Sequence, residues 1–127
     1  MDRFKFRAWD DYNKRMYKPF DMVERLEAVE PFLRGFKYLQ CTGLKDKHGK
    51  LIFEGDIIEH RYKLFKTQPE IISRLEIIWE DEYAAFSGFN NKKIRFSIGA
   101  GMKWLHDFEI IGNIYENPEL LEDKHHI

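Results

Sequence analysis

Cysteine is nearly absent from this chain, in which Cys41 is the only one among 127 residues. A single thiol cannot form an internal disulfide, so apolar packing must stabilise the fold, as is typical of proteins in a reducing cytosol. No neighbouring residue would activate the thiol, and we interpret Cys41 as a buried, inert side chain.

The sequence also lacks an excess of one charge. Its 21 Lys and Arg balance 22 Asp and Glu, and the formal net charge is -1. The protein as a whole therefore has no field that would attract nucleic acid or an anionic membrane, although a basic face can still exist locally.

Long apolar runs are missing as well. No segment approaches the roughly 18 apolar residues of a membrane span. Residues 1–7 alternate charged and aromatic side chains, whereas a secretory signal needs an unbroken apolar segment. We therefore expect a cytoplasmic protein that has no membrane partner.

Large apolar side chains, by contrast, are plentiful, with 43% hydrophobic and 16% aromatic residues. They are sufficient to fill one β-rich core and exclude disorder throughout the chain. The length fits one domain, since domains commonly have roughly 100–150 residues. We divide this single compact chain into an N-terminal β-hairpin and connecting region (1–54) and a C-terminal β-barrel-like unit (55–127).

Hairpin signals dominate the N-terminal region. Residues 4–9 alternate with period two, which predicts a strand with one buried face. Turn-forming residues at 10–13 predict a reversal, with the partner strand at 14–17. Capping-box spacing and helical periodicity predict a short helix at 21–29.

Three glycines punctuate residues 42–60, where apolar runs alternate with polar turns. Gly43 follows a predicted strand, Gly49 closes a four-residue turn, and Gly55 lies in the turn that precedes the next strand. We interpret all three as structural turn positions that need the backbone freedom of glycine.

From residue 55 onward, short β-rich segments recur with turn signals between them. They predict five strands, at 57–62, 75–80, 83–89, 93–98 and 108–114. Five is the number of strands in a compact barrel of the Src-homology-3 type. The fold class is therefore predicted to be mainly β, with an N-terminal hairpin region followed by a small five-stranded, Src-homology-3-like barrel.

Two further segments complete this C-terminal unit. Residues 63–73 include Pro69 and are predicted to form an extended loop. Asn117 as cap and Pro118 at the first helical position predict a short helical turn near the C-terminus.

No constellation of residues predicts a reaction. The five histidines have no partner at the spacing of a zinc or catalytic motif. Carboxylates cluster at Glu54 with Asp56 and at 80–82, but no third metal ligand follows at a fixed spacing. We expect these carboxylates to serve turns and solubility, and we expect no enzyme, metal site or cofactor.

Three blocks stand in order along nearly the whole chain: FKFRAWD at 4–10, TGLKDKHG at 42–49 continuing to EGDII at 54–58, and IGNIYENP at 111–118. Together they resemble the YopX family. The resemblance implies a small, β-rich protein of a phage or prophage, with a tendency to form oligomers and no established activity or catalytic residues. Residues 63–73 match none of the blocks, so features specific to this chain are expected there.

The leading functional hypothesis is a self-associating protein-interaction module, with an unidentified phage or host protein as a further partner. The chain carries more large apolar surface than a small core encloses, and short strands have edges that need cover. Trp9 and Trp104 are predicted to be exposed and to anchor such contacts, since aromatic residues are enriched at interfaces.

The alternative hypothesis is a nucleic-acid-binding module acting in phage replication or gene regulation. Basic and aromatic residues interleave near the N-terminus and again at 61–66, a combination suited to phosphates and stacked bases. The candidate contacts are Lys5, Arg7, Arg61, Lys63 and Lys66.

Overall fold

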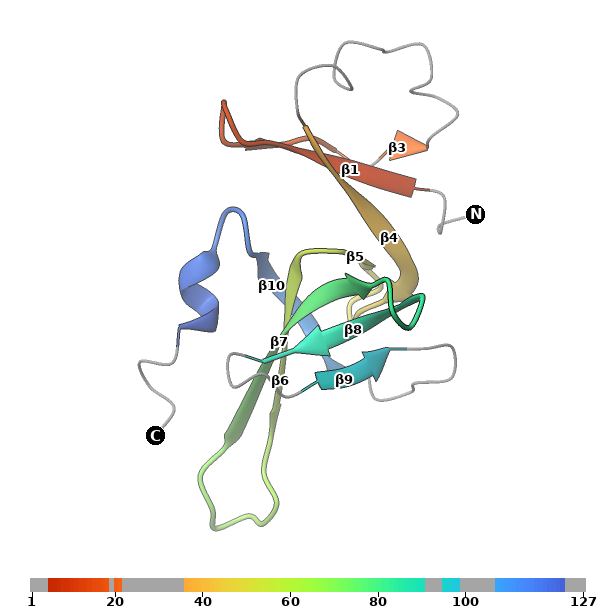
Figure 1. Cartoon of the computed structure of the whole chain (residues 1–127). Helices are drawn as coiled ribbons and strands as arrows, with labels where there is room; N and C mark the ends of the chain where they lie inside the picture. Colours follow the sequence, from red (N-terminus) through yellow and green to blue (C-terminus); the bar gives the residue numbers. More distant parts are fainter. Residues whose placement is uncertain (1–4, 19, 22–35, 91–94, 99–106, 123–127) are drawn as a thin grey trace.

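The computed structural model describes residues 5–18, 20–21, 36–90, 95–98 and 107–122 (Figure 1). Within these ranges the chain forms ten strands and one 3-10 helix. The strands are β1 (Lys5–Asp10), β2 (Arg15–Met16), β3 (Phe20–Asp21), β4 (Lys37–Lys45), β5 (Leu51–Phe53), β6 (Asp56–Tyr62), β7 (Ile71–Glu80), β8 (Ala85–Phe89), β9 (Arg95–Ile98) and β10 (Glu109–Asn113). The helix, η3, covers Pro118–Leu121, and the mainly-β prediction is confirmed.

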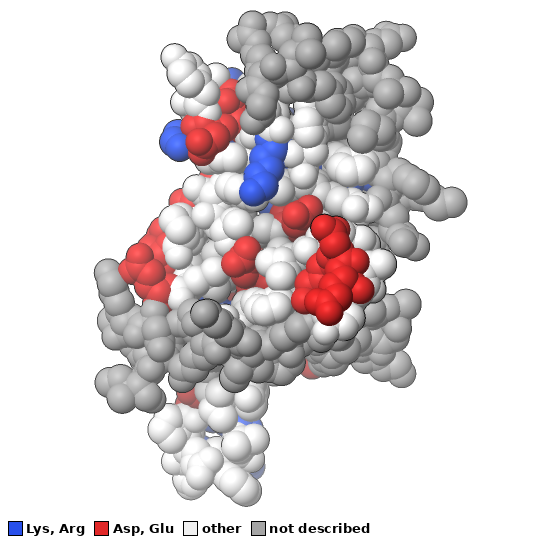
Figure 2. Space-filling model, viewed as in Figure 1, with Lys and Arg blue, Asp and Glu red and all other residues white. Residues whose placement is uncertain are grey.

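The strands form two antiparallel sheets. The first has the order β2-β1-β4-β5, with β3 also paired to β1. The second has the order β10-β6-β7-β8-β9 and curls into a half-barrel (Figure 1). The turn that joins β7 to β8 lies beneath a cluster of acidic side chains on the face shown in Figure 2.

The second sheet contains the strands that the alternation predicted, with shifted ends. In particular, β7 begins at Ile71, inside the segment predicted as loop, because residues 71–73 pair with the end of β6. Among the described strands the hydrogen-bonded order runs from β10 to β9 without a pairing that closes the circle. The chain passes from the first sheet to the second between β5 and β6. The division into an N-terminal unit (1–54) and a C-terminal unit (55–127) stays a prediction.

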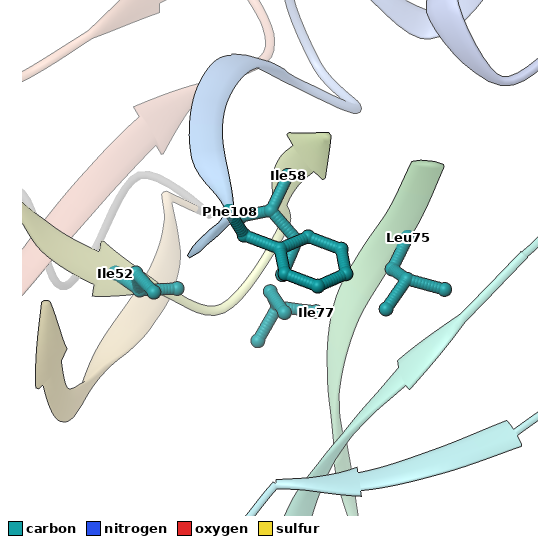
Figure 3. Packing of buried hydrophobic residues seen from close by; sticks show 5 residues of the cluster. All are labelled: Ile52, Ile58, Leu75, Ile77 and Phe108. Carbon is teal, nitrogen blue, oxygen red and sulfur yellow. The ribbon is translucent and has the colours of Figure 1, made fainter. Parts of the chain in front are cut away.

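One hydrophobic cluster serves both sheets (Figure 3). It contains Ile52 of β5, Ile58 of β6, Leu75 and Ile77 of β7, and Phe108 just before β10. On β7 the two buried residues are two positions apart, as period two requires for a strand with one face on a core. The sheets therefore pack around common apolar contacts.

Gly55 lies at the junction between the sheets. Its φ is 88°, in the left-handed region. Its N–H donates to the Ile77 carbonyl over 2.7 Å, and its own carbonyl accepts from the Ile114 N–H over 2.9 Å. A Cβ at this position would lie 2.9 Å from Cε2 of Tyr115. Both the backbone conformation and the available space therefore require glycine here.

An ion pair also crosses the junction, between Arg7 of β1 and Asp56 of β6. The Asp56 side chain is 1% exposed and accepts the Phe53 N–H over 2.7 Å. Burial raises the pKa of Asp56, whereas the Arg7 charge and the Phe53 N–H act in the opposite direction. Loss of either partner would leave the other charge buried and uncompensated.

Asp46, in the connection from β4 to β5, makes a second polar link. Its Oδ1 accepts the N–H groups of His48 and Lys50, each over 2.9 Å. Its Oδ2 accepts the N–H of Ile110 in β10 over 3.0 Å. Burial alone would raise the pKa of Asp46, but these three donors outweigh it and lower the pKa. Asp46 thus stabilises its own turn through Oδ1 and joins the two sheets through Oδ2.

Two predicted helical elements have different outcomes. The expected helix at 21–29 lies almost entirely outside the described residues. At the C-terminus a 3-10 helix begins at Pro118, but Asn117 makes no side-chain capping bond. Its Oδ1 instead accepts the backbone N–H of Asn113 over 3.2 Å. Among the described residues, no helix has the length and apolar character needed to cross a membrane.

Candidate interaction surface

The hairpin of β6 and β7 extends from the body of the protein and ends in a loop (Figure 1). The pairing of the two strands continues to Tyr62 opposite Ile71. Every residue from 61 to 70 is exposed. We call residues 61–70 the arm, because the hairpin there has no cover from other described residues.

An aromatic row leads into the arm. The Tyr62 ring stacks on His60 with centroids 5.0 Å apart, and His60 stacks on Phe108 of the core with centroids 5.1 Å apart. The His60 ring also contacts the carbonyl of Asp107, with Nδ1 at 3.1 Å from the oxygen. These contacts position the base of the arm, so the hairpin is supported up to Tyr62.

Beyond this support the arm presents apolar side chains to solvent. Leu64 and Phe65 are each 65% exposed, and Tyr62 is 39% exposed. Lys63 and Lys66 are exposed beside them. Exposed aromatic and aliphatic side chains flanked by polar residues are typical of surfaces that bind another molecule.

Ion pairs stabilise the base of the arm. Glu59 is buried and accepts hydrogen bonds from the Nε–H groups of Arg61 and Arg74, each over 2.7 Å. Arg61 reaches Glu70 on the returning chain over 3.2 Å. Burial alone would raise the pKa of Glu59, but the hydrogen bonds and charges of the two arginines lower it. Arg61 is therefore committed to carboxylates of this chain.

A second exposed surface lies at the other end of β7. The turn from 80 to 84 carries three carboxylates, those of Glu80, Asp81 and Glu82. Two aromatic side chains accompany them, since Trp79 is 39% and Tyr83 is 55% exposed. We call residues 79–84 the acidic turn.

The acidic turn has a defined geometry. Trp79 Nε1 donates to Oδ1 of Asp81 over 2.7 Å, and the indole meets the Phe86 ring edge to face with centroids 5.0 Å apart. Glu80 accepts the hydroxyl of buried Ser87. Ala84 has a positive φ of 47°, which closes the turn. The indole and the carboxylates of Glu80 and Asp81 are therefore held in place before any partner binds.

Of the two tryptophans predicted to be exposed, Trp9 lies among the described residues. Trp9 is 4% exposed and stacks on Tyr115 with ring centroids 5.4 Å apart. The expected exposure of Trp9 is wrong, because the side of β1 predicted to face solvent packs against the second sheet. Trp104 lies outside the described residues.

The five candidate nucleic-acid contacts do not form one surface. Arg7 is paired with Asp56 and its side chain is 14% exposed, so the premise that it is free for phosphate is wrong. Lys5 lies on the same strand, β1. Arg61, Lys63 and Lys66 are exposed residues of the arm, but Arg61 is paired with Glu59 and Glu70.

The three predicted turn glycines all have positive φ: 81° at Gly43, 80° at Gly49 and 88° at Gly55. Gly49 and Gly55 lie in turns. Gly43 lies within β4 instead, between Cys41 and Lys45 where the pairing with β5 shifts register. A bulged strand and a tight turn can both require a positive φ, so a glycine in the sequence does not tell which of the two is present.

Leu64, Trp79 and Tyr83 were not singled out by sequence reasoning. Trp79 lies two and four positions after buried Ile77 and Leu75, so alternation along β7 places it on their face of the strand and predicts burial. It is exposed because β7 continues past the core. The available signal was the acidic run that follows it, since a strand that ends in three carboxylates ends in solvent.

No group of three or more His, Cys, Asp or Glu among the described residues could hold a metal ion. The carboxylates at positions 54, 56 and 80–82 fall at the junction and in the acidic turn. Asp56 is engaged by Arg7 there, and Asp81 is engaged by Trp79 in the turn.

Comparison with known proteins identifies the family. The family model of the YopX protein matches residues 18–122. The crystal structure of protein EF1440 from Enterococcus faecalis is similar with a TM-score of 0.58 and 26% sequence identity, over 93% of this chain and 97% of that chain. A search of curated proteins gave no match. Because the family model covers most of the sequence, this chain belongs to the YopX family.

Proposed function

We propose that this protein is a self-associating protein-interaction module rather than an enzyme, and that the arm is its principal docking surface. The observation that carries the proposal is the exposed tip formed by Tyr62, Leu64 and Phe65. The two strands that present it are paired up to Tyr62, so docking requires little ordering of the hairpin there.

The energetics support association through this tip. Complete burial of one large apolar side chain contributes about 1.5–3 kcal/mol. Within the arm, Leu64 and Phe65, each 65% exposed, are the large apolar side chains with the most surface left to bury. Aromatic anchors in a small apolar patch commonly dominate the affinity of an interface.

The proposed setting is the cytoplasm of a bacterial cell that carries a phage or prophage. The resemblance of the chain to YopX-like proteins supports this setting. A phage or host protein is a further partner in this proposal, and it would compete for the same arm.

Size-exclusion chromatography with light scattering tests self-association. We expect a mass above that of one chain at micromolar concentration, and a shift toward the monomer in the double variant Leu64→Ser/Phe65→Ser. Tyr12→Ser is the matched control, because Tyr12 is 93% exposed but lies in the β1–β2 turn. A clean wild-type monomer at micromolar concentration would overturn the proposal.

The alternative is binding of single-stranded nucleic acid by the same arm. Lys63 and Lys66 beside exposed Tyr62 and Phe65 favour it, since cations with stacking platforms suit a single strand. It predicts a mobility shift of a labelled single-stranded oligonucleotide that weakens steeply with salt and is abolished in Lys63→Glu/Lys66→Glu. No shift of single- or double-stranded DNA or RNA at low salt would exclude it.

A further inference from the structure

We infer that the arm of one copy docks on the acidic turn of a second copy, so that the chain associates head to tail. This inference rests on the proposed self-association and identifies both sides of the contact. The two surfaces carry opposite charge: the arm contributes Lys63 and Lys66, since Arg61 is paired with Glu59 and Glu70, whereas the acidic turn contributes three carboxylates and no cation.

The apolar parts of the two surfaces also match. The arm offers Leu64 and Phe65, each 65% exposed, and the acidic turn offers Trp79 and Tyr83, 39% and 55% exposed. Trp79 is held by Asp81 and Phe86, so an aromatic platform is preorganised between the carboxylates. Packing of Phe65 on an indole surrounded by carboxylates would place Lys63 and Lys66 next to opposite charge.

The two surfaces cannot meet within one chain. They lie at opposite ends of β7, which has ten residues from Ile71 to Glu80. At about 3.3 Å per residue a strand of this length spans roughly 30 Å. Because the arm pairs rigidly up to Tyr62 opposite Ile71, it cannot fold back onto its own acidic turn, and the acceptor must belong to another molecule.

Symmetric alternatives bring like charges together. An arm-to-arm contact would place Lys63 and Lys66 of both copies side by side, and a turn-to-turn contact would place six carboxylates together. Juxtaposed like charges cost several kcal/mol at an interface. Arm-to-turn docking instead uses two different patches of each copy, and such a heterologous contact generates either a closed ring or an open chain of molecules.

Complementation between two disabled variants tests the inference. The arm variant is Leu64→Ser/Phe65→Ser, which keeps an intact acidic turn. The turn variant is Asp81→Lys/Glu82→Lys, which keeps an intact arm. We expect each variant alone to be monomeric, with association weakened at least roughly tenfold. An equimolar mixture should form a one-to-one dimer, because one intact arm and one intact turn remain.

A charge-exchanged pair provides a second measurement in which Leu64 and Phe65 of the arm are unchanged. Lys63→Glu/Lys66→Glu and Asp81→Lys/Glu82→Lys should each fail to associate alone. Mixed together they should associate again, since every arm then faces a turn of opposite charge. Far-ultraviolet circular dichroism that matches the wild type shows that each variant has kept its fold.

The outcomes separate this inference from the proposed function. If the wild type associates but the turn variant associates equally well, or if neither mixture restores association, head-to-tail docking is wrong while self-association stands. If the wild type is a monomer, both are wrong. A dimer in the complementation mixture and its absence from each separate variant would support the arm-to-turn contact.

Discussion

The two halves of β6 differ sharply although they belong to one strand of seven residues. Asp56, Ile57, Ile58 and Glu59 are all buried, whereas Arg61 and Tyr62 are exposed. The first half lies at the junction of the two sheets, and the second half leads into the arm. The buried half therefore contributes to stability, whereas the exposed half leads to the surface that we propose for contact with partners.

The charged residues of the two regions show the same division. At the junction, Arg7 and Asp56 are withdrawn from solvent and depend on each other. Along the arm, Arg61 is half-exposed and has two carboxylate partners. Removing a charge should therefore destabilise the protein more at the junction than along the arm.

The largest effect on stability is expected from Gly55→Val. Valine would impose a positive φ on a β-branched residue, which costs about 1–3 kcal/mol. It would also place Cβ 2.9 Å from Cε2 of Tyr115, and overpacking adds about 1–3 kcal/mol. Chemical denaturation should show a loss of about 2–6 kcal/mol, a large part of the total for a small domain.

Gly49→Val is the matched control for this change. Gly49 has a φ of 80°, and a Cβ there would meet nothing within 4 Å. It should lose only the backbone contribution of about 1–3 kcal/mol. A Gly55→Val variant that melts like the wild type would show that the junction is not where the two sheets are joined.

The next largest effect is expected from Arg7→Gln. The change leaves the Asp56 carboxylate, whose side chain is 1% exposed and whose pKa burial already raises, without its countercharge. Breaking one side of a buried pair costs about 3 kcal/mol. Lys14→Gln is the control, because Lys14 and Asp11 form a pair with side chains 69% and 79% exposed. Denaturation midpoints close to each other for the two variants would contradict the buried role of Asp56.

Asp46→Asn should cost about 1–3 kcal/mol, because the asparagine amide cannot accept the Ile110 N–H as Oδ2 does. This loss should depend on pH. The pKa of Asp46 is lowered in the folded protein, so the folded state binds fewer protons than the unfolded chain, in which an aspartate titrates near about 3.9. Its contribution is present above that value and is lost as the pH falls through the folded pKa.

The free-energy difference between wild type and Asp46→Asn should therefore shrink below about pH 4. Denaturation curves of both proteins at several pH values measure it. The comparison removes the contribution of Asp56, whose pKa is raised and whose stabilisation changes in the opposite direction. A difference that stays constant from neutral to acidic pH would show that the Asp46 carboxylate does not hold Ile110.

The same contrast explains what the sequence could predict. Period-two alternation and positive-φ glycines are local signals, so the strands of the second sheet and the conformations of Gly49 and Gly55 were predictable. Trp9 was misplaced because alternation tells which side chains share a face but not what covers that face. Tyr115 and Asp56 cover it, and they lie far away in the sequence.

The arm was only partly predictable for a related physical reason. Residues 63–73 were expected to form a loop specific to this chain, and Arg61, Lys63 and Lys66 were identified as surface cations. However, pairing of Ile71 with Tyr62 extends the hairpin, and strand pairing depends on the partner as well as on local composition. The pairing of Arg61 with Glu59 and Glu70 could not be read from charge alone.

The smallest effect on stability is expected in the arm itself. Leu64→Ser/Phe65→Ser changes two side chains that are each 65% exposed, and such surface changes alter the unfolding free energy by about 0.5 kcal/mol or less. The wild type and this variant should therefore have the same denaturation midpoint at a concentration where both are monomeric. At higher concentration the wild type alone should gain stability, because association stabilises the folded state by mass action. If the variant were instead destabilised as strongly as Arg7→Gln, the arm would be part of the folded core, and the division of β6 into a structural half and a binding half would be wrong.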